Sequence, residues 1–312
     1  MKKLLTLVLA LALTLSIAGC NNTTVDPVPS ATPSAESTVS PSPTPTPEGF
    51  ELTAENFPRL DGSTATIPLA EAVVATLLGI PRAEAAEFIN FSTTTYAYQN
   101  LMREETDLLI VYEGLKETMD YVRDEFILAP IGRDALVFLV NAENPIDDIT
   151  EEQLIAIYRG EITNWNQIGG SDGEIIPYQR DESSGSQSMF RKLVVGAAEL
   201  VEAPAGLVIS GMYGLVEAIA NYDNGPRAIG YNVFYYVTQM KDDENVKMLS
   251  IGGVMPSSET IASGAYPYCN DFFAVIRKDT PLESSTYAVF NWLQGAQARD
   301  LMSHEHYVPL LP

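Results

Sequence analysis

Apolar and polar residues follow two patterns along this chain, one typical of helices and one typical of buried strands. Residues 67–79 place apolar side chains on one helical face, with Pro68 suited to a first turn and Gly79 to a C-cap. Helical periodicity also marks residues 151–160, 188–197, 213–222 and 286–302. Short, near-continuous apolar runs, typical of strands in a sheet covered on both faces, occupy residues 107–112, 135–141 and 272–277. This alternation of helices and strands predicts an α/β fold.

The N-terminal residues have a different pattern. Two lysines precede an apolar run from Leu4 to Ala18, and small residues follow it up to Cys20. The run is shorter than the roughly 18 apolar residues that a membrane span needs. We therefore expect residues 1–19 to be a secretory signal peptide and Cys20 to be lipidated, which would anchor the protein to the outer side of the cell membrane.

Residues 20–49 are rich in Pro, Ser and Thr and contain few apolar residues, so we interpret them as a linker. Residues 50–312 exceed the usual size of a single hydrophobic core, which favours two lobes. The second cysteine, Cys269, is left without an intramolecular partner once Cys20 is lipidated. The folded part therefore cannot depend on a disulfide.

The charge of the chain limits its partners. It contains 18 basic and 41 acidic residues, a net charge of −23 at pH 7. Nucleic acid and anionic lipid are poor partners for such a surface. An anionic ligand would need a local pocket, because the overall field repels it.

Three turns rich in hydroxyl groups each precede a predicted helix, at residues 61–68, 91–101 and 182–190. A single turn of this kind is usually an ordinary helix cap. Three of them, each offering hydroxyl donors and free backbone N–H groups at a positive helix end, suggest that they converge on one small oxyanion.

The third turn contains more than capping requires. Arg180 can offer a planar fork of donors to two oxygens of an anion, and Gly185 allows the backbone to approach closely. Glu182 would repel an anion unless that anion donates a proton to it, as phosphate can and sulfate cannot. The alternative is that Arg180, Asp181 and Glu182 form a solvated surface run with an internal ion pair.

Residues 131–170 and 175–190 together resemble the phosphate-binding lipoproteins of bacterial ABC transporters, which have type II periplasmic-binding-protein folds. The Arg-x-Asp/Glu-x-Ser-Gly-Thr loop of that family matches Arg180, Glu182, Ser184, Gly185 and Ser186. The resemblance extends from about residue 59 to the C-terminus. The chain departs from the family in having Ser at 183 and 186, where Gly and Thr are usual, and Tyr112-Glu113 after a strand that often ends in a small or acidic residue.

The resemblance implies a two-lobed α/β fold in which each lobe is a mostly parallel sheet flanked by helices. Lobe I would comprise residues 50–138 and 258–312, and lobe II residues 139–257, with crossings near 137–141 and 266–273. The ligand would lie in the cleft between the lobes. The implied ligand-binding residues are Thr64, Ala65, Thr66, Thr94, Thr95, Arg180, Glu182, Ser184, Gly185 and Ser186.

The implied function is capture of inorganic phosphate by a monomeric protein that delivers it to the permease and ATPase subunits of an ABC importer, without a metal or cofactor. The alternative is a binding protein or sensor for another oxyanion or phosphorylated small molecule. A serine hydrolase is disfavoured, because the only histidines are His304 and His306 and no Gly-x-Ser-x-Gly motif occurs, so we expect no enzyme. We attribute the aromatic run Tyr231, Phe234, Tyr235 and Tyr236 to packing.

Overall fold

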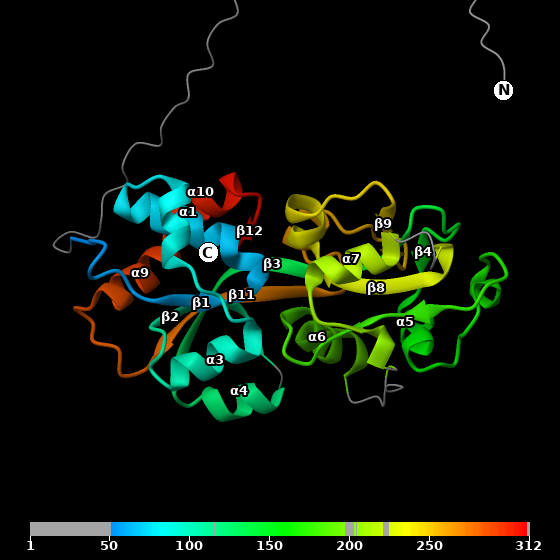
Figure 1. Ribbon diagram of the computed structural model, residues 1–312, viewed down its shortest axis with the longest axis horizontal. Coiled ribbons are helices and arrows are strands. Elements are labelled where there is room, and N and C mark those ends of the chain that lie inside the picture. Colours follow the sequence, from blue (N-terminus) through cyan, green and yellow to red (C-terminus); the bar gives the residue numbers. More distant parts are fainter. Residues whose placement is uncertain (1–50, 115, 197–202, 204, 221–224, 311–312) are drawn as a thin grey trace, which may run out of the picture. The chain divides into compact units, whose positions relative to one another are not determined.

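The computed structural model describes residues 51–114, 116–196, 203, 205–220 and 225–310, and all structural statements below concern these residues (Figure 1). The expected signal peptide, Cys20 and the linker lie outside them.

One mixed sheet of eight strands forms the centre of the fold. Its main path contains β1 (Leu60–Gly62), β2 (Leu108–Tyr112), β11 (Cys269–Arg277), β3 (Phe126–Asn141), β8 (Ala228–Val233) and β5 (Ile176–Pro177), in that order. Both β12 (Val308–Pro309) and β9 (Val246–Met248) also pair with β3. The beginning of β3 pairs with β11 and its end pairs with β8 and β9. We call the part containing β1, β2, β11 and β12 the first half, and the part containing β5, β8 and β9 the second half.

The three predicted strands are confirmed as β2, the end of β3, and β11. The sheet is less parallel than we expected. The β1–β2 and β5–β8 pairings are parallel, whereas β3 and β11 make only antiparallel pairings with their neighbours. The reason is that β3 leads from the first half to the second while β11 runs beside it in the opposite direction. Two small parallel pairs complete the strands: β4 (Asp148–Ile149) with β10 (Ser250–Ile251), and β6 (Gln179–Arg180) with β7 (Val208–Ile209).

Helices flank the sheet on both faces (Figure 1). The first half has η1 (Thr64–Thr66), α1 (Ile67–Leu78), α2 (Arg82–Ala85), η2 (Ala86–Phe88), α3 (Thr94–Met102), α4 (Lys116–Val122), α8 (Ser258–Ala262), α9 (Ser285–Leu293) and α10 (Ala296–His304). The second half has α5 (Glu151–Tyr158), η3 (Trp165–Ile168), α6 (Gly185–Phe190), η4 (Arg191–Val195), η5 (Ala205–Leu207), α7 (Met212–Ala220), η6 (Gly225–Arg227) and η7 (Tyr236–Met240).

The predicted helix at 67–79 is confirmed as α1, which has Pro68 in its first turn and ends at Gly79 in the left-handed conformation. The predicted helix at 286–302 is divided into α9 and α10, because Gly295 is extended and caps the second of them. Among the described residues, no single helix has the length and apolarity to cross a membrane. The helical segments Thr64–Leu78 and Arg82–Phe88 have that length and apolarity only when they are taken together, and the chain bends by 113° between them.

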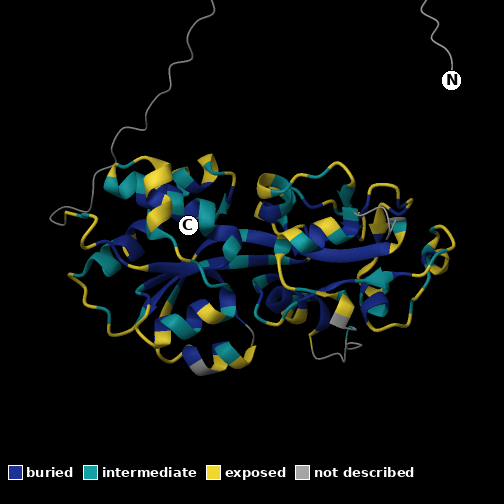
Figure 2. Cartoon of the chain, viewed as in Figure 1, coloured by how far each residue is buried: buried dark blue, intermediate teal, exposed yellow. Residues whose placement is uncertain are grey.

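Buried residues line the sheet and the inner faces of the helices (Figure 2). In the second half, the ring of Phe190 at the end of α6 stacks on Tyr231 of β8 with a centroid distance of 4.3 Å. Phe138 of β3 contacts both rings. The Tyr231 hydroxyl accepts a hydrogen bond from the Arg180 N–H at 3.1 Å and donates one to the side chain of Gln187. The aromatic core therefore fixes the segment that carries Arg180 and the start of α6.

Candidate anion-binding site

A cavity of about 350 Å³ lies where loops of the two halves meet, and we call it the anion cavity. The first half contributes polar side chains that include Ser63, Thr64 and Thr94, and the second half contributes Arg180 and Ser186. Of the ten predicted ligand-binding residues, the cavity brings together Thr64, Ala65, Thr94, Arg180, Ser184, Gly185 and Ser186. All three hydroxyl-rich turns therefore reach one cavity.

Arg180 is the only cation among the described residues that line this cavity. Its side chain donates from Nε to the carbonyl of Ile209 at 3.0 Å, from Nη2 to the carbonyl of Ser210 at 2.9 Å, and from Nη1 to Ser186 Oγ at 3.1 Å. Within the described part of the chain, no carboxylate lies within 4.0 Å of it. Only 3% of the residue is exposed, and burial lowers the pKa of Arg180, although an arginine remains charged at neutral pH. The cavity therefore contains a buried positive charge whose partners, as far as the chain is described, are neutral.

The first two turns are tied together by a buried carboxylate. Asp61 accepts hydrogen bonds from the N–H of Ser92 at 2.7 Å, from the Ser92 hydroxyl at 2.6 Å and from the Asn100 side chain at 2.9 Å. At the cavity itself, Ser63 Oγ and Thr94 Oγ1 are 2.7 Å apart. The residue before Thr94, Thr93, has a φ of 86°, which is unusual for a β-branched residue and marks backbone strain beside the cavity.

The third turn begins α6. The Ser184 side chain caps this helix by accepting a hydrogen bond from the Gln187 N–H at 3.1 Å. The backbone N–H groups that open a helix have no acceptor within it, so those of Gly185 and Ser186 are suited to an anion. A Cβ at Gly185 would lie 2.6 Å from Thr94 Oγ1 and 3.1 Å from the Tyr112 ring. Glycine therefore allows the two halves to touch beside the cavity.

Three predicted ligand-binding residues do not line the cavity. Thr66 is fully buried, and its hydroxyl donates to the carbonyls of Ser63 at 2.9 Å and Ile110 at 2.6 Å, so it stabilises the first turn. Thr95 contacts the other half through its N–H, 3.4 Å from the carbonyl of Ser183. Its hydroxyl is buried and has no hydrogen-bond partner among the described residues.

Glu182 is the third residue outside the cavity, and the structure contradicts the expected position of its carboxylate. Its side chain is 57% exposed and pairs with Arg191, with Nε 2.9 Å from Oε2. It also accepts a hydrogen bond from the Gln187 side chain at 3.1 Å. The guanidinium of Arg191, at the start of η4, therefore holds the Glu182 carboxylate at the surface. This arrangement resembles the alternative given in the sequence analysis, in which Glu182 belongs to a surface ion pair.

The sequence interpretation missed several residues that line the cavity. Ser63 belongs to the first hydroxyl-rich turn but was not chosen as a ligand. Tyr236, which we attributed to packing, lines the cavity, as do Met212 and Ser210. No local pattern marks Ser210, because it reaches the site through the pairing of β7 with β6.

Tyr112 forms part of the cavity wall at the end of β2. Its hydroxyl donates a hydrogen bond to Asp134 at 2.6 Å. Asp134 is 2% exposed, and burial raises the pKa of this carboxyl to about 6. This acid supports the cavity wall and does not itself line the cavity.

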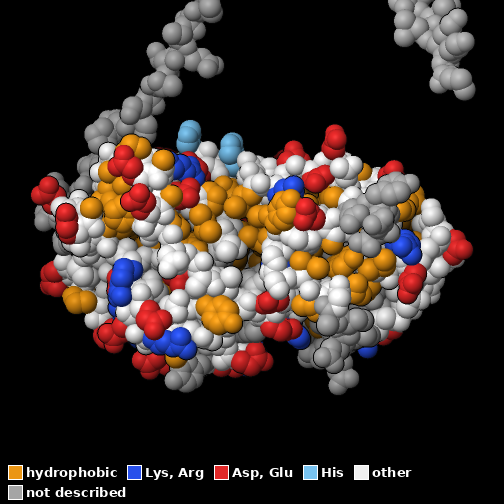
Figure 3. Space-filling model, in the orientation of Figure 1, with side chains coloured by type: hydrophobic (Ala, Val, Ile, Leu, Met, Phe, Trp, Pro, Cys, Tyr) orange, Lys and Arg blue, Asp and Glu red, His pale blue; other side chains and the backbone are white. Residues whose placement is uncertain are grey.

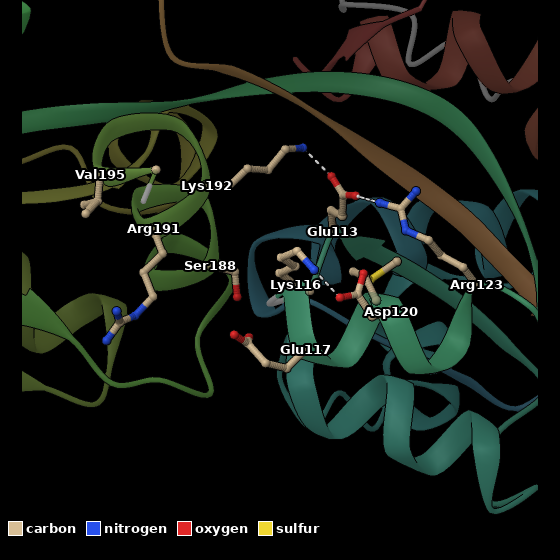
Figure 4. A pocket seen from close by; sticks show the side chains of 12 residues that line it. Glu113, Lys116, Glu117, Asp120, Arg123, Ser188, Arg191, Lys192 and Val195 are labelled. Atoms are coloured by element: carbon tan, nitrogen blue, oxygen red, sulfur yellow. Dashed lines mark hydrogen bonds and ion pairs between the residues drawn. The ribbon is translucent and has the colours of Figure 1, made fainter. Parts of the chain in front are cut away.

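A second cavity, of about 440 Å³, lies between α4 and the α6–η4 segment, and we call it the ion-pair cavity (Figure 4). Glu113 pairs with Arg123 of the first half at 2.6 Å and with Lys192 of the second half. Lys116 pairs with Asp120. The remaining cation, Arg191, pairs with Glu182 as described above. Every cation that lines this cavity therefore already has a carboxylate partner.

Comparisons with known proteins agree with this geometry. A family model described as "PBP superfamily domain" matches residues 60–296. The "Phosphate-binding protein PstS" of Bacillus subtilis is 36% identical over 136 residues, which are 43% of this chain and 42% of that protein. The protein of the same name from Borreliella burgdorferi is 27% identical over 67% of this chain and 70% of its own length. The match thus spans less than half the length of the Bacillus relative.

Solved structures show the same fold. An ABC-type phosphate transport receptor from Vibrio cholerae matches with a TM-score of 0.63 and 24% identity, covering 84% of this chain and all of that one. A putative phosphate ABC transporter substrate-binding protein from Clostridium perfringens, with bound phosphate, matches with a TM-score of 0.66 and 22% identity over 81% and 98% of the two chains. These similarities confirm the expected two-lobed α/β architecture.

Proposed function

The chain belongs to the PBP superfamily, and we propose that it captures inorganic phosphate outside the cytoplasm and delivers it to an ABC importer. The relatives named above are phosphate-binding proteins, and the matching solved structures are phosphate receptors of transporters. Phosphate is the ligand that these names support for a cavity of this kind.

The buried, unpaired charge of Arg180 carries the proposal. A buried cation without a carboxylate partner is costly, and a bound anion removes that cost. The carbonyls of Ile209 and Ser210 and the Ser186 hydroxyl hold the guanidinium in place before any ligand arrives. A preorganised cation loses little conformational entropy when it binds an anion.

We further propose how the anion is held. Arg180 and the start of α6 would bind it from residues 139–257, and the turns that contain Thr64 and Thr94 would bind it from the lobe formed by residues 50–138 and 258–312. Closure of the lobes would then present one surface to the permease. Thr66 and Asp61 would act indirectly, by holding the turns of the first lobe in shape.

The attachment to the membrane belongs to the proposal as well. Lipidation at Cys20, with the Pro-rich linker as a tether, rests on the sequence pattern. We propose a monomer that binds its ligand without chemical change. In support of binding rather than catalysis, neither His304 nor His306 is among the described residues that line the anion cavity, so no histidine there can activate a serine.

Calorimetric titration of the purified, phosphate-stripped chain tests the proposal. We expect phosphate to bind with a Kd of about 1 μM or lower, which corresponds to about −8 kcal/mol or better. Sulfate and molybdate, titrated under the same conditions, show how selective the cavity is. Absence of binding by all three anions would remove the proposed function.

A further inference from the structure

The anion cavity has two chemically different kinds of lining. Around Arg180 it offers hydroxyl and N–H donors, as described above. It is also lined by Ile67 at the start of α1, Met212 at the start of α7, Val233 of β8, and Tyr236 and Met240 of η7. We call these five residues the apolar lining. Figure 3 shows hydrophobic side chains gathered on this face where α1 and α7 approach each other.

The apolar lining is formed jointly by the two halves. Thr64 Oγ1 of the first half is 4.0 Å from Met212 Sδ of the second half. Val233 is 1% exposed and Tyr236 is 8% exposed, so they form a fixed wall, whereas 40% of Met240 is exposed at the opening. Apolar surface of this kind beside a charged group can bury the carbon part of a ligand whose anionic part contacts Arg180.

The cavity is larger than inorganic phosphate requires. Phosphate has five non-hydrogen atoms, and at roughly 30 Å³ for each water-sized atom it would occupy at most about 150 Å³. The anion cavity measures about 350 Å³. Cavities that hold organic ligands start at roughly 300 Å³. Phosphate bound at Arg180 would therefore leave part of the cavity unfilled.

The cavity is also poor in strong acceptors. No aspartate or glutamate occurs among the described residues that line it, since Glu182 pairs with Arg191 at the surface and Asp134 is bonded to Tyr112. Inorganic phosphate near neutral pH keeps at least one P–OH proton, which needs an acceptor. A phosphate monoester has a second pKa near 6, so at pH 7 or above it is mainly a dianion without such a proton. Its three free oxygens match a cavity that mostly donates.

We infer that the anion cavity accepts phosphate monoesters with a small apolar alcohol part. The phosphate group would contact Arg180 and the start of α6, and the carbon chain would lie against Met212, Val233 and Tyr236. This inference rests on the proposed function, because it uses the same anion-binding groups, and it adds a class of ligand to inorganic phosphate.

A ligand series tests the inference on the purified, phosphate-stripped chain at one pH near 8 and one salt concentration. Inorganic phosphate, methyl phosphate, ethyl phosphate and n-propyl phosphate are titrated by calorimetry. We expect the affinity to rise by about threefold to fourfold for each added methylene that is buried. The propyl ester should bind at least as tightly as inorganic phosphate.

Variants locate the carbon chain. Met212→Ala should reduce the affinity ratio of propyl phosphate to methyl phosphate by about fivefold or more, and Met212→Leu should retain it, because leucine restores the apolar volume. Met255→Ala is the matched control. Met255 is 48% exposed and does not line the cavity, so its replacement should leave the ratio unchanged.

The outcomes separate this inference from the proposed function. Binding of phosphate with esters at least a hundredfold weaker would overturn the inference and leave the proposed function in place. Binding of esters without inorganic phosphate would support the inference and overturn the proposed function. Binding of neither would overturn both, and equal ratios in wild type and Met212→Ala would overturn the placement of the carbon chain.

Discussion

The two cavities between the halves of this protein carry positive charge in opposite ways. In the ion-pair cavity, Lys192 and Arg123 share the carboxylate of Glu113, and the other cations are paired as well (Figure 4). In the anion cavity, Arg180 is buried, and its hydrogen-bond partners among the described residues are neutral oxygens. The ion-pair cavity is larger and has more charged groups, yet the buried charge without a described carboxylate partner lies in the anion cavity.

This difference teaches that the number of charged side chains is a poor guide to a binding site. A cation that already has a carboxylate must give up that partner before it binds an anion, whereas Arg180 has no carboxylate partner in the part of the chain that the structure describes. The ion pairs of the second cavity are partly exposed, with Lys192 48% and Arg123 60% exposed at the side chain, so each contributes little free energy. This network of ion pairs links the surfaces of the two halves but does not form an anion-binding site.

The largest effect is expected for Arg180→Ala. Loss of a charge-assisted hydrogen bond costs about 1.5 to 3 kcal/mol, so the Kd for phosphate should rise roughly 10- to 150-fold in calorimetry. Arg191→Ala is the matched control, because that arginine already pairs with Glu182. This substitution should change the Kd for phosphate by less than about threefold. Equal effects of the two substitutions would erase the distinction between the cavities.

Gly185→Ala should come next. Its Cβ would lie 2.6 Å from Thr94 Oγ1, so the halves could not approach beside the anion cavity without displacing that hydroxyl. Overpacking of this kind costs about 1 to 2 kcal/mol, and we expect phosphate affinity to fall about 5- to 30-fold. Gly206→Ala is the control, since no atom of the described residues lies within 4 Å of a Cβ there. Unchanged affinity in Gly185→Ala would show that close contact of the halves is not needed.

A smaller effect is expected for Lys192→Met, which breaks the ion pair with Glu113 that links the two halves. Exposed ion pairs contribute at most about 1 kcal/mol, so phosphate affinity should change by less than about fivefold. The difference in Kd between Lys192→Met and the wild type should be smaller in high salt, because salt screens the ion pair and weakens it in the wild type. A tenfold or larger loss would give the ion-pair cavity a direct part in binding.

The smallest effect is expected for Glu182→Gln. Because this carboxylate is paired with Arg191 outside the anion cavity, the ratio of phosphate to sulfate affinity should stay within about twofold of the wild type. Both titrations are made at one pH and one salt concentration. A tenfold shift of the ratio in favour of sulfate would restore the role that the sequence suggested, in which Glu182 accepts the ligand's proton.

Local patterns predicted much of the fold. The helix at 67–79 and the strands at 107–112 and 272–277 were found from periodicity and apolar runs, because burial on one face or two leaves a direct trace in neighbouring residues. The direction in which strands pair leaves no such trace. The antiparallel pairings of β3 and β11 depend on where the chain returns, and the sequence interpretation missed them.

The candidate site was also predictable only where it consists of local motifs. The hydroxyl-rich turns and Arg180 are local motifs, and the structure brings them to one cavity. Ser210, Met212 and Tyr236 enter that cavity only through tertiary contacts. The position of Glu182 was missed because it depends on Arg191, which follows the end of α6, nine residues further along the chain.

Anomalous diffraction from crystals grown with arsenate, a phosphate analogue that scatters strongly, tests the central claim most directly. We predict one arsenic peak in the anion cavity, with an oxygen within hydrogen-bonding distance of the Arg180 guanidinium, at roughly 2.7 to 2.9 Å. The ion-pair cavity should show no peak. A peak beside Lys192 or Arg123, or arsenate bound with its oxygens out of reach of Arg180, would contradict the claim that the unpaired arginine forms the anion site.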